Sequence, residues 1–151
     1  MKKYTVLAIL LTCLNTGLFA QNEEAAIKQT VNNLFIGMKS GDSTIARSAF
    51  ANDCIMQTIV SKNGTASART ENLNQFIKFI GSVAKDKLDE RIVFTKILID
   101  GPLAVVWTDY KFYLNNTFSH CGVNSFQLVK GAKGWRIVYL IDTRRKDECE
   151  E

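Results

Sequence analysis

The 151-residue sequence contains one histidine, one proline and four scattered cysteines, and it has no glycine-rich phosphate loop. Zinc sites use several histidine and cysteine ligands at short spacing, which this sequence does not offer. No serine stands in the strand-turn-helix motif of serine hydrolases. We therefore expect a protein that works without a metal ion or another cofactor.

An excess of charge of one sign is also missing, since 19 Lys and Arg residues face 15 Asp and Glu residues. Without Lys2 and Lys3, which fall in a predicted leader, the balance is 17 − 15 = +2. Proteins that bind nucleic acid need a clustered basic face. The one basic cluster, Arg144-Arg145-Lys146, lies beside an acidic tail, so we expect no nucleic-acid partner.

The apolar run near the start of the chain, from Val6 to Leu14, is too short to cross a bilayer. It follows Lys2 and Lys3 and ends before the small residue Ala20, which is the order of a secretory signal peptide. We predict that residues 1–20 are removed after Ala20. A secreted or periplasmic domain of residues 21–151 then remains, with no membrane span. A lipid on Cys13 is the alternative, although Thr12 departs from the usual lipoprotein box.

The mature segment has the size of one domain. Apolar residues at helical spacing predict an amphipathic helix over residues 22–40, and further patterns predict helices over 42–50 and 70–84. Runs rich in β-branched and aromatic residues predict strands over 54–60, 66–70, 91–99, 103–114, 117–130 and 135–143. This order is an α+β fold, in which helices cover one face of a mostly antiparallel sheet.

The last three strands form two consecutive hairpins and organise the fold. A two-residue turn at Asn115-Asn116 would pair Leu114 with Thr117, and it would then place Lys111 opposite His120 and Asp109 opposite Gly122. A loop from Gly131 to Gly134 would pair Lys130 with Trp135, Phe126 with Tyr139 and Asn124 with Ile141. A β-bulge in these strands would exchange the faces beyond it.

Because side chains alternate along a strand, this register gathers both tryptophans and the single histidine on one face, which we interpret as the wall of a pocket. That face carries Trp107, Asp109, Lys111, Tyr113, Phe118, His120, Asn124, Phe126, Leu128, Trp135, Ile137, Tyr139 and Ile141. The opposite face carries Val106, Tyr110, Phe112, Val123 and Leu140. If helices cover the first face, this second apolar face predicts a homodimer interface.

The order of elements resembles the nuclear transport factor 2-like, or cone-shaped α+β, superfamily. The last three predicted strands carry motifs similar to those of its "putative lumazine-binding" branch, near the polyketide-cyclase-like relatives. These motifs are Trp107–Phe112, Phe118–Phe126, and Gly134–Ile137 with Ile141–Arg144. The resemblance covers the mature chain. It implies a curved sheet wrapped around helices, a conical pocket and frequent dimerisation through the outer sheet face. It implies no reaction, because the superfamily includes isomerases, dehydratases, cyclases and binding proteins.

Asp109 and His120 are the candidate catalytic residues, because the predicted register makes them diagonal neighbours. A carboxylate that accepts a proton from one imidazole nitrogen raises the basicity of the other, so such a pair can transfer protons near neutral pH. In related folds an Asp-His pair serves dehydration or proton abstraction beside a carbonyl. The alternative is a buried polar pair that only organises the sheet.

Five further residues are candidate ligand contacts: Trp107, Lys111, Asn124, Phe126 and Tyr139. Asn124 could orient a ligand by hydrogen bonding, and Lys111 could stand at the pocket mouth. Tyr139 could also orient a ligand, although an aromatic side chain among aliphatic neighbours fits a packed core better, and Trp107 is expected in the core first and as a stacking platform second.

The mature chain has three cysteines, so at most one internal disulfide can form. The position of Cys121 in the middle of a strand suggests a small buried hydrophobe. Cys149 lies in a charged tail and is the cysteine that is free to pair outside the chain.

Three functions fit the sequence. The first is a binding protein for a small, partly aromatic or apolar organic molecule, with no chemistry. The second is a cofactor-free lyase or isomerase that uses Asp109 and His120, and the third is a structural dimeric module whose cone is filled by side chains.

Overall fold

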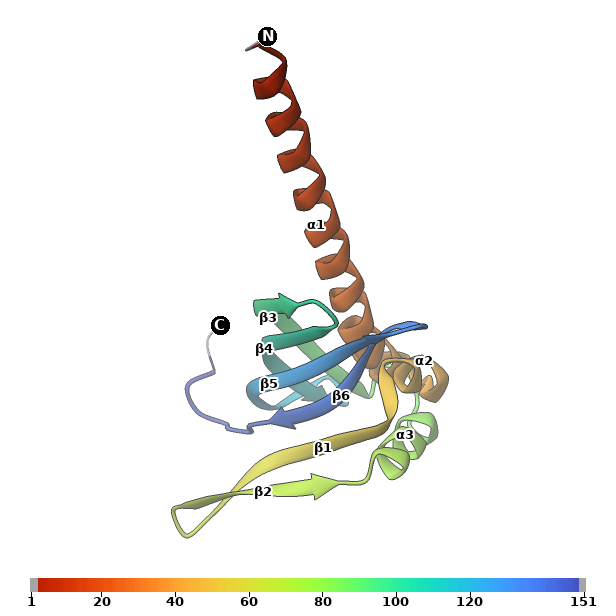
Figure 1. Cartoon of the computed structure of the whole chain (residues 1–151). Helices are drawn as coiled ribbons and strands as arrows, with labels where there is room; N and C mark the ends of the chain where they lie inside the picture. Colours follow the sequence, from red (N-terminus) through yellow and green to blue (C-terminus); the bar gives the residue numbers. More distant parts are fainter. Residues whose placement is uncertain (1–2, 150–151) are drawn as a thin grey trace.

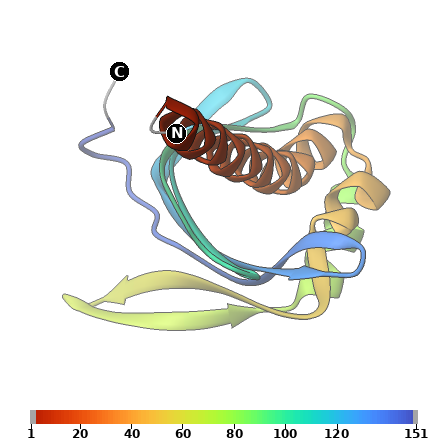
Figure 2. The ribbon, with the colours of Figure 1, turned by 45° about the horizontal axis from the view of Figure 1, so that its top comes forward.

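A curved six-stranded sheet wraps around one long helix in the computed structural model, which describes residues 3–149, with side chains from residue 21 (Figures 1 and 2). The helices are α1 (Lys3–Ser40), α2 (Ser43–Ser48) and α3 (Leu73–Ser82). The strands are β1 (Phe50–Lys62), β2 (Thr65–Glu71), β3 (Leu88–Asp100), β4 (Leu103–Leu114), β5 (Thr117–Gly131) and β6 (Gly134–Asp142). The predicted α+β fold is confirmed.

Helix α1 starts earlier than the sequence predicted, because its backbone continues through most of the expected signal peptide, and this first part projects from the body (Figure 1). Met1, Lys2 and the side chain of Cys13 lie outside what the structure describes. Among the described residues, no helix is both long enough and apolar enough to cross a membrane.

The strand order β2-β1-β6-β5-β4-β3 makes the sheet antiparallel except where β1 runs parallel to β6. The turns that join the strands are those that the sequence predicted. Asn115 and Asn116 both adopt positive φ, and Leu114 pairs with Thr117 across them. Lys130 pairs with Trp135 beyond the loop at Gly131 to Gly134. Short polar side chains and glycine tolerate these left-handed conformations, which tight hairpins require.

Two β-bulges correct the predicted register. Ser119 is an extra residue in β5, so Phe112 rather than Lys111 lies opposite His120, and Asp109 lies opposite Val123 rather than Gly122. A second irregularity at Val138 pairs Phe126 with Leu140, not Tyr139, and Asn124 with Asp142, not Ile141. Each bulge moves all residues beyond it to the other face of the sheet.

As a consequence, the concave face that covers α1 is a mixture of the two predicted faces. From β5 and β6 it takes His120, Asn124, Phe126, Leu128, Trp135 and Ile137, as predicted, while β4 contributes Val106, Tyr110 and Phe112, which the sequence had placed outside. The predicted dimer face is therefore wrong. Val106, Tyr110 and Leu140 are buried on the helix side, and of the five predicted residues only Val123 remains on the outer face.

The core lies between α1 and the concave face. Ile27, Val31 and Leu34 are buried on the helix, and Phe126, Leu128 and Ile137 are buried on the sheet. The rings of Phe35 and Phe126 meet edge to face, with 6.3 Å between their centroids. This packing fills one end of the cone and leaves the other end open.

Candidate functional site

The open end of the cone holds a cavity of about 530 Å³, within the range of about 300–1,000 Å³ that is usual for small-molecule sites. Apolar side chains of α1 and α3 form one wall, and the concave face of the sheet forms the other. The apolar lining includes Leu34, Phe35, Met38, Met56, Phe76, Phe79, Leu88, Phe112, Leu114 and Leu140. The polar lining includes Gln57, Arg69, Glu71, Asn72, Gln75, Glu90, His120, Asn124, Asp142 and Arg144.

Two of the predicted site residues, His120 and Asn124, line this cavity. The His120 ring lies against aromatic neighbours, with centroids 5.1 Å from Phe112 and 5.7 Å from Tyr110. Its Nδ1 is 3.0 Å from the hydroxyl of Ser119, the bulge residue. Burial lowers the pKa of His120 below its ordinary value, and the positive charge of Arg144 acts in the same direction. His120 is therefore neutral at pH 7.

The predicted contact between Asp109 and His120 does not form. Asp109 is exposed on the outer face, whereas His120 points into the cone. The bulge at Ser119 is the cause, because it shifts the register of β5 by one residue between the turn and the predicted pair. A lyase or isomerase mechanism built on these two side chains has no geometric basis.

The four remaining candidates do not line the cavity either. Trp107 is 46% exposed, and it lies on the outer face together with Lys111 and Tyr139. The Tyr139 hydroxyl donates to Gln57 Oε1 over 2.7 Å. Phe126 is on the concave face, as predicted, but it is fully buried in the core and does not line the cavity.

Glu90 of β3 is the principal site residue that the sequence reasoning missed. Its side chain reaches across the sheet, where Asn124 Nδ2 donates to Glu90 Oε1 over 2.9 Å. Within residues 21–149 no hydrogen bond to Oε2 is present. Glu90 stands two residues before Ile92 and four before Phe94, so a carboxylate on an apolar face was the available signal.

Burial raises the pKa of Glu90 to about 7, and the negative charge of Asp142 adds to this effect. The hydrogen bond from Asn124 and the charge of Arg144 act in the opposite direction. Glu90 lines the cavity, and the residue as a whole is only partly buried. At neutral pH the cavity therefore contains an acid that exists in both protonation states.

The other acidic groups of the lining have basic partners. Arg144 Nε lies 2.8 Å from Asp142 Oδ2, and Arg69 Nη2 lies 2.7 Å from Glu71 Oε1. Asp142 and Arg144 both line the cone, because the Val138 irregularity turns the end of β6 toward the concave face.

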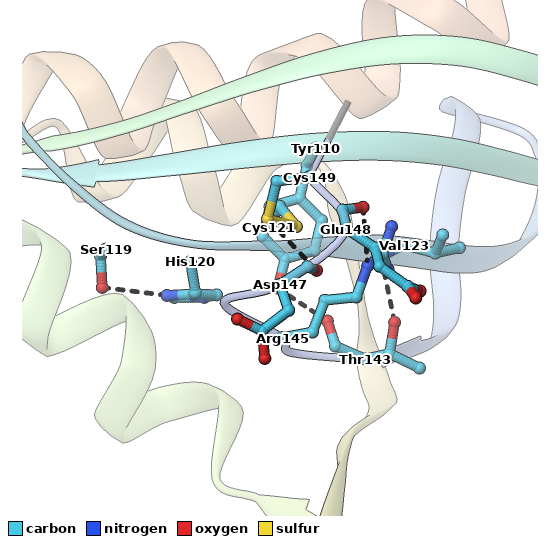
Figure 3. The surroundings of a disulfide bond; sticks show 10 residues. All are labelled: Tyr110, Ser119, His120, Cys121, Val123, Thr143, Arg145, Asp147, Glu148 and Cys149. Atoms are coloured by element: carbon cyan, nitrogen blue, oxygen red, sulfur yellow. Dashed lines mark hydrogen bonds between the residues drawn. A yellow bond between two sulfur atoms is a disulfide. The ribbon is translucent and has the colours of Figure 1, made fainter. Parts of the chain in front are cut away.

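The C-terminal tail is fixed at the back of the site by a disulfide between Cys121 and Cys149 (Figure 3). The predictions that Cys121 is only a buried hydrophobe and that Cys149 pairs outside the chain are therefore wrong. The limit of one internal disulfide holds, and Cys54 is free. The Tyr110 hydroxyl donates to the Thr143 carbonyl oxygen over 2.8 Å. These contacts set the positions of Asp142 and Arg144, which flank Thr143.

The titration of Glu90 predicts a stability effect. A carboxyl group whose folded-state pKa is raised destabilises the fold as pH rises from the unfolded value near 4.5 through about 7. We expect Glu90→Gln to raise the free energy of unfolding by about 1–2 kcal/mol at pH 8, a value that already allows for screening by water in the cavity. At pH 5 Glu90 is protonated in the folded state, so the variant should differ little from the wild type. Urea unfolding at both pH values measures this. A variant that is equally stable or less stable at pH 8 would refute the assignment.

A second hollow of about 590 Å³ lies outside the cone, between α2, α3 and the start of β1. It is shallow and open. Its two charged groups already donate to backbone oxygens, Arg47 to those of Phe50 and Ala51 and Arg136 to that of Trp135. Because this hollow is open and its two arginines have backbone partners, the cone is the candidate site.

Comparison with known proteins supports this architecture. Residues 22–140 match the model of a family described as "Putative lumazine-binding". No curated protein matches the sequence. Solved structures with the same fold are distant in sequence. One is a nuclear transport factor 2-like protein of unknown function from Shewanella baltica, 21% identical over 83% of this chain and 96% of that one, with a TM-score of 0.68.

Two further structures carry the fold. A nuclear transport factor 2-like protein with a cystatin-like fold from Novosphingobium aromaticivorans is 15% identical over 92% of each chain, with a TM-score of 0.67. A domain of unknown function with a cystatin-like fold from Nostoc punctiforme is 16% identical over 84% of this chain and 80% of that one, with a TM-score of 0.65. At such identities these structures bear on the fold alone.

Proposed function

Because the chain belongs to the "putative lumazine-binding" family of nuclear transport factor 2-like proteins, we propose that it binds a small organic molecule in the cone and catalyses no reaction. The observation that carries this proposal is the cavity, whose apolar wall from α1 and α3 faces a polar floor from β3, β5 and β6. Apolar walls with a few convergent polar groups are typical of binding sites.

A purely structural module is disfavoured by the same cavity. In such a module side chains would fill the cone, because protein interiors are close-packed. Here Glu90 and Asn124 line an open cavity instead. Polar groups at such a position cost stability unless they have hydrogen-bond partners, and a ligand would supply such partners.

The binding proposal predicts that a bulky side chain at the cavity wall blocks the ligand. Gln75 of α3 and the preceding residue Asn74 are both exposed, but only Gln75 lines the cavity. We expect native mass spectrometry of exported protein to show a small molecule on the wild type and on Asn74→Trp, and none on Gln75→Trp. Equal occupancy of the two tryptophan variants would count against the cone as the site.

Export of the protein is part of the proposal. The family match begins at residue 22, and Glu23 accepts hydrogen bonds from Lys130 over 2.7 Å and from Trp135 over 2.9 Å. Cleavage after Ala20 would leave these contacts intact. We therefore propose a secreted or periplasmic protein that starts at Gln21.

We also propose a homodimer through the outer sheet face, with residues that differ from those the sequence suggested. Val93 is 64% exposed and Trp107 is 46% exposed on neighbouring strands of this face. We expect Trp107→Asp to give monomers in sedimentation experiments at micromolar concentration, while Lys111→Asp, which is also on this face but already polar, has a smaller effect. A wild type that sediments as a monomer would exclude the dimer.

A further inference from the structure

The charges of the cavity lining are unevenly partnered. Asp142 is paired with Arg144, and Glu71 is paired with Arg69. Glu90 has only a neutral partner, the side-chain amide of Asn124. Among the residues from 21 to 149, it is the one acidic group of the lining without a basic partner. The cavity therefore lacks one positive charge at its floor.

The groups that face Glu90 do not supply this charge. On β4 the phenol of Tyr110 is kept neutral, because burial raises its pKa further. On β5 the imidazole of His120 bonds to Ser119 and is neutral at pH 7. Arg144 is held by Asp142, 2.8 Å away. The α1 and α3 side chains of the lining are apolar or carry an amide, namely Leu34, Phe35, Met38, Asn72, Gln75, Phe76 and Phe79.

We propose that the cavity selects an amphipathic organic cation, whose protonated nitrogen binds the free Oε2 of Glu90 and whose apolar body lies against α1 and α3. This deepens the proposed function and rests on it. A positive nitrogen would complete the missing ion pair, and a charged hydrogen bond is stronger when water is excluded. Phe76, Phe79 and Phe112 offer aromatic faces and edges to the apolar part of the ligand.

The selectivity should depend on pH in a defined direction. A cation binds to the ionised carboxylate, so its affinity should rise as Glu90 loses its proton around pH 7. From pH 6 to pH 8 the ionised fraction of such a group grows about 10-fold, and the affinity should follow. A neutral ligand of the same shape should show no such rise.

The experiment is an NMR titration of the mature protein with 2-phenylethylamine, which stays protonated between pH 6 and 8, and with two matched probes. 2-Phenylethanol is the neutral probe and 3-phenylpropionate is the anionic one. At pH 8 we expect the amine to bind at least about 10-fold more tightly than the alcohol, and the acid to bind most weakly. Glu90→Gln should remove both the preference and the pH dependence, while binding of the alcohol persists.

Two control variants separate the explanations. Asp109→Asn removes an exposed carboxylate from the outer face and should change nothing. His120→Gln should retain the rise of affinity with pH, which excludes the imidazole as its source. If Glu90→Gln does not fold, the pH dependence of the wild type together with His120→Gln still decides the proposal.

Two results would overturn the inference. If the alcohol or the acid binds as tightly as the amine, the cavity binds ligands but does not select cations, and the proposed function stands without this inference. If none of the three probes shifts any cavity resonance at millimolar concentration, the proposed function fails together with the inference.

Discussion

Gly122→Ala is expected to destabilise the protein by about 3 kcal/mol or more and to deform the cavity floor. A Cβ at this position of β5 would overlap the carbonyl oxygen of Thr143 and lie 2.8 Å from Cε1 of Tyr110. The first of these atoms belongs to the backbone, so a side-chain rotation cannot relieve the overlap. The strands must separate, and the hydrogen bond from Tyr110 to Thr143 must break.

This change reaches the site because Asp142 and Arg144 flank Thr143 and line the cavity. Gly131→Ala is the matched control, since it lies in the same strand with nothing within 4 Å of the added methyl group. Urea unfolding and ligand titration of both variants measure the effect. A Gly122→Ala protein as stable as Gly131→Ala would show that the chain after β6 does not pack against β5 as described.

Loss of the Cys121–Cys149 disulfide is expected to lower the free energy of unfolding by about 3 kcal/mol. The bond joins residues 28 positions apart, so it restricts the unfolded chain, and loop-closure entropy for such a separation is of this size. In the native state it holds the tail against β5, where Arg145 and Cys121 exchange two backbone hydrogen bonds (Figure 3).

Cys149→Ser tests this expectation by thermal and urea unfolding. Addition of a reductant should destabilise the wild type to the level of the variant and leave the variant unchanged. Burial raises the pKa of the free Cys54 thiol to about 11, so this cysteine is a poor competitor for disulfide exchange. A wild type that is insensitive to reductant would contradict the assigned role of the bond.

Local patterns in the sequence were sufficient to predict the elements of the fold. Asn115 and Asn116 fixed a hairpin because their side chains tolerate the positive φ that the turn demands. Apolar residues such as Ile27 and Val31 at helical spacing identified the part of α1 that packs on the sheet. These features depend on neighbours a few residues away, which a single sequence shows directly.

The site could be predicted only in part, because it depends on the curvature of the sheet. One extra residue, Ser119, separates His120 from Asp109 and brings it against Phe112. A bulge has no reliable sequence signature, and an error of one residue inverts a whole strand. His120 and Asn124 come after the bulge in β5, and the sequence assigned this part of β5 to the correct face. The residues of β4 lie on the other side of the bulge and were all assigned to the wrong face.

The identity of the binding face is tested most directly by an NMR titration of the mature protein with indole, a small neutral aromatic molecule, observed at the methyl groups. We predict that indole shifts the methyl resonances of Met38, Met56 and Leu140, which line the cavity, and leaves those of Val93, Leu98 and Val105 on the outer face unchanged. Shifts confined to the outer-face methyl groups would contradict the assignment of the ligand site to the interior of the cone.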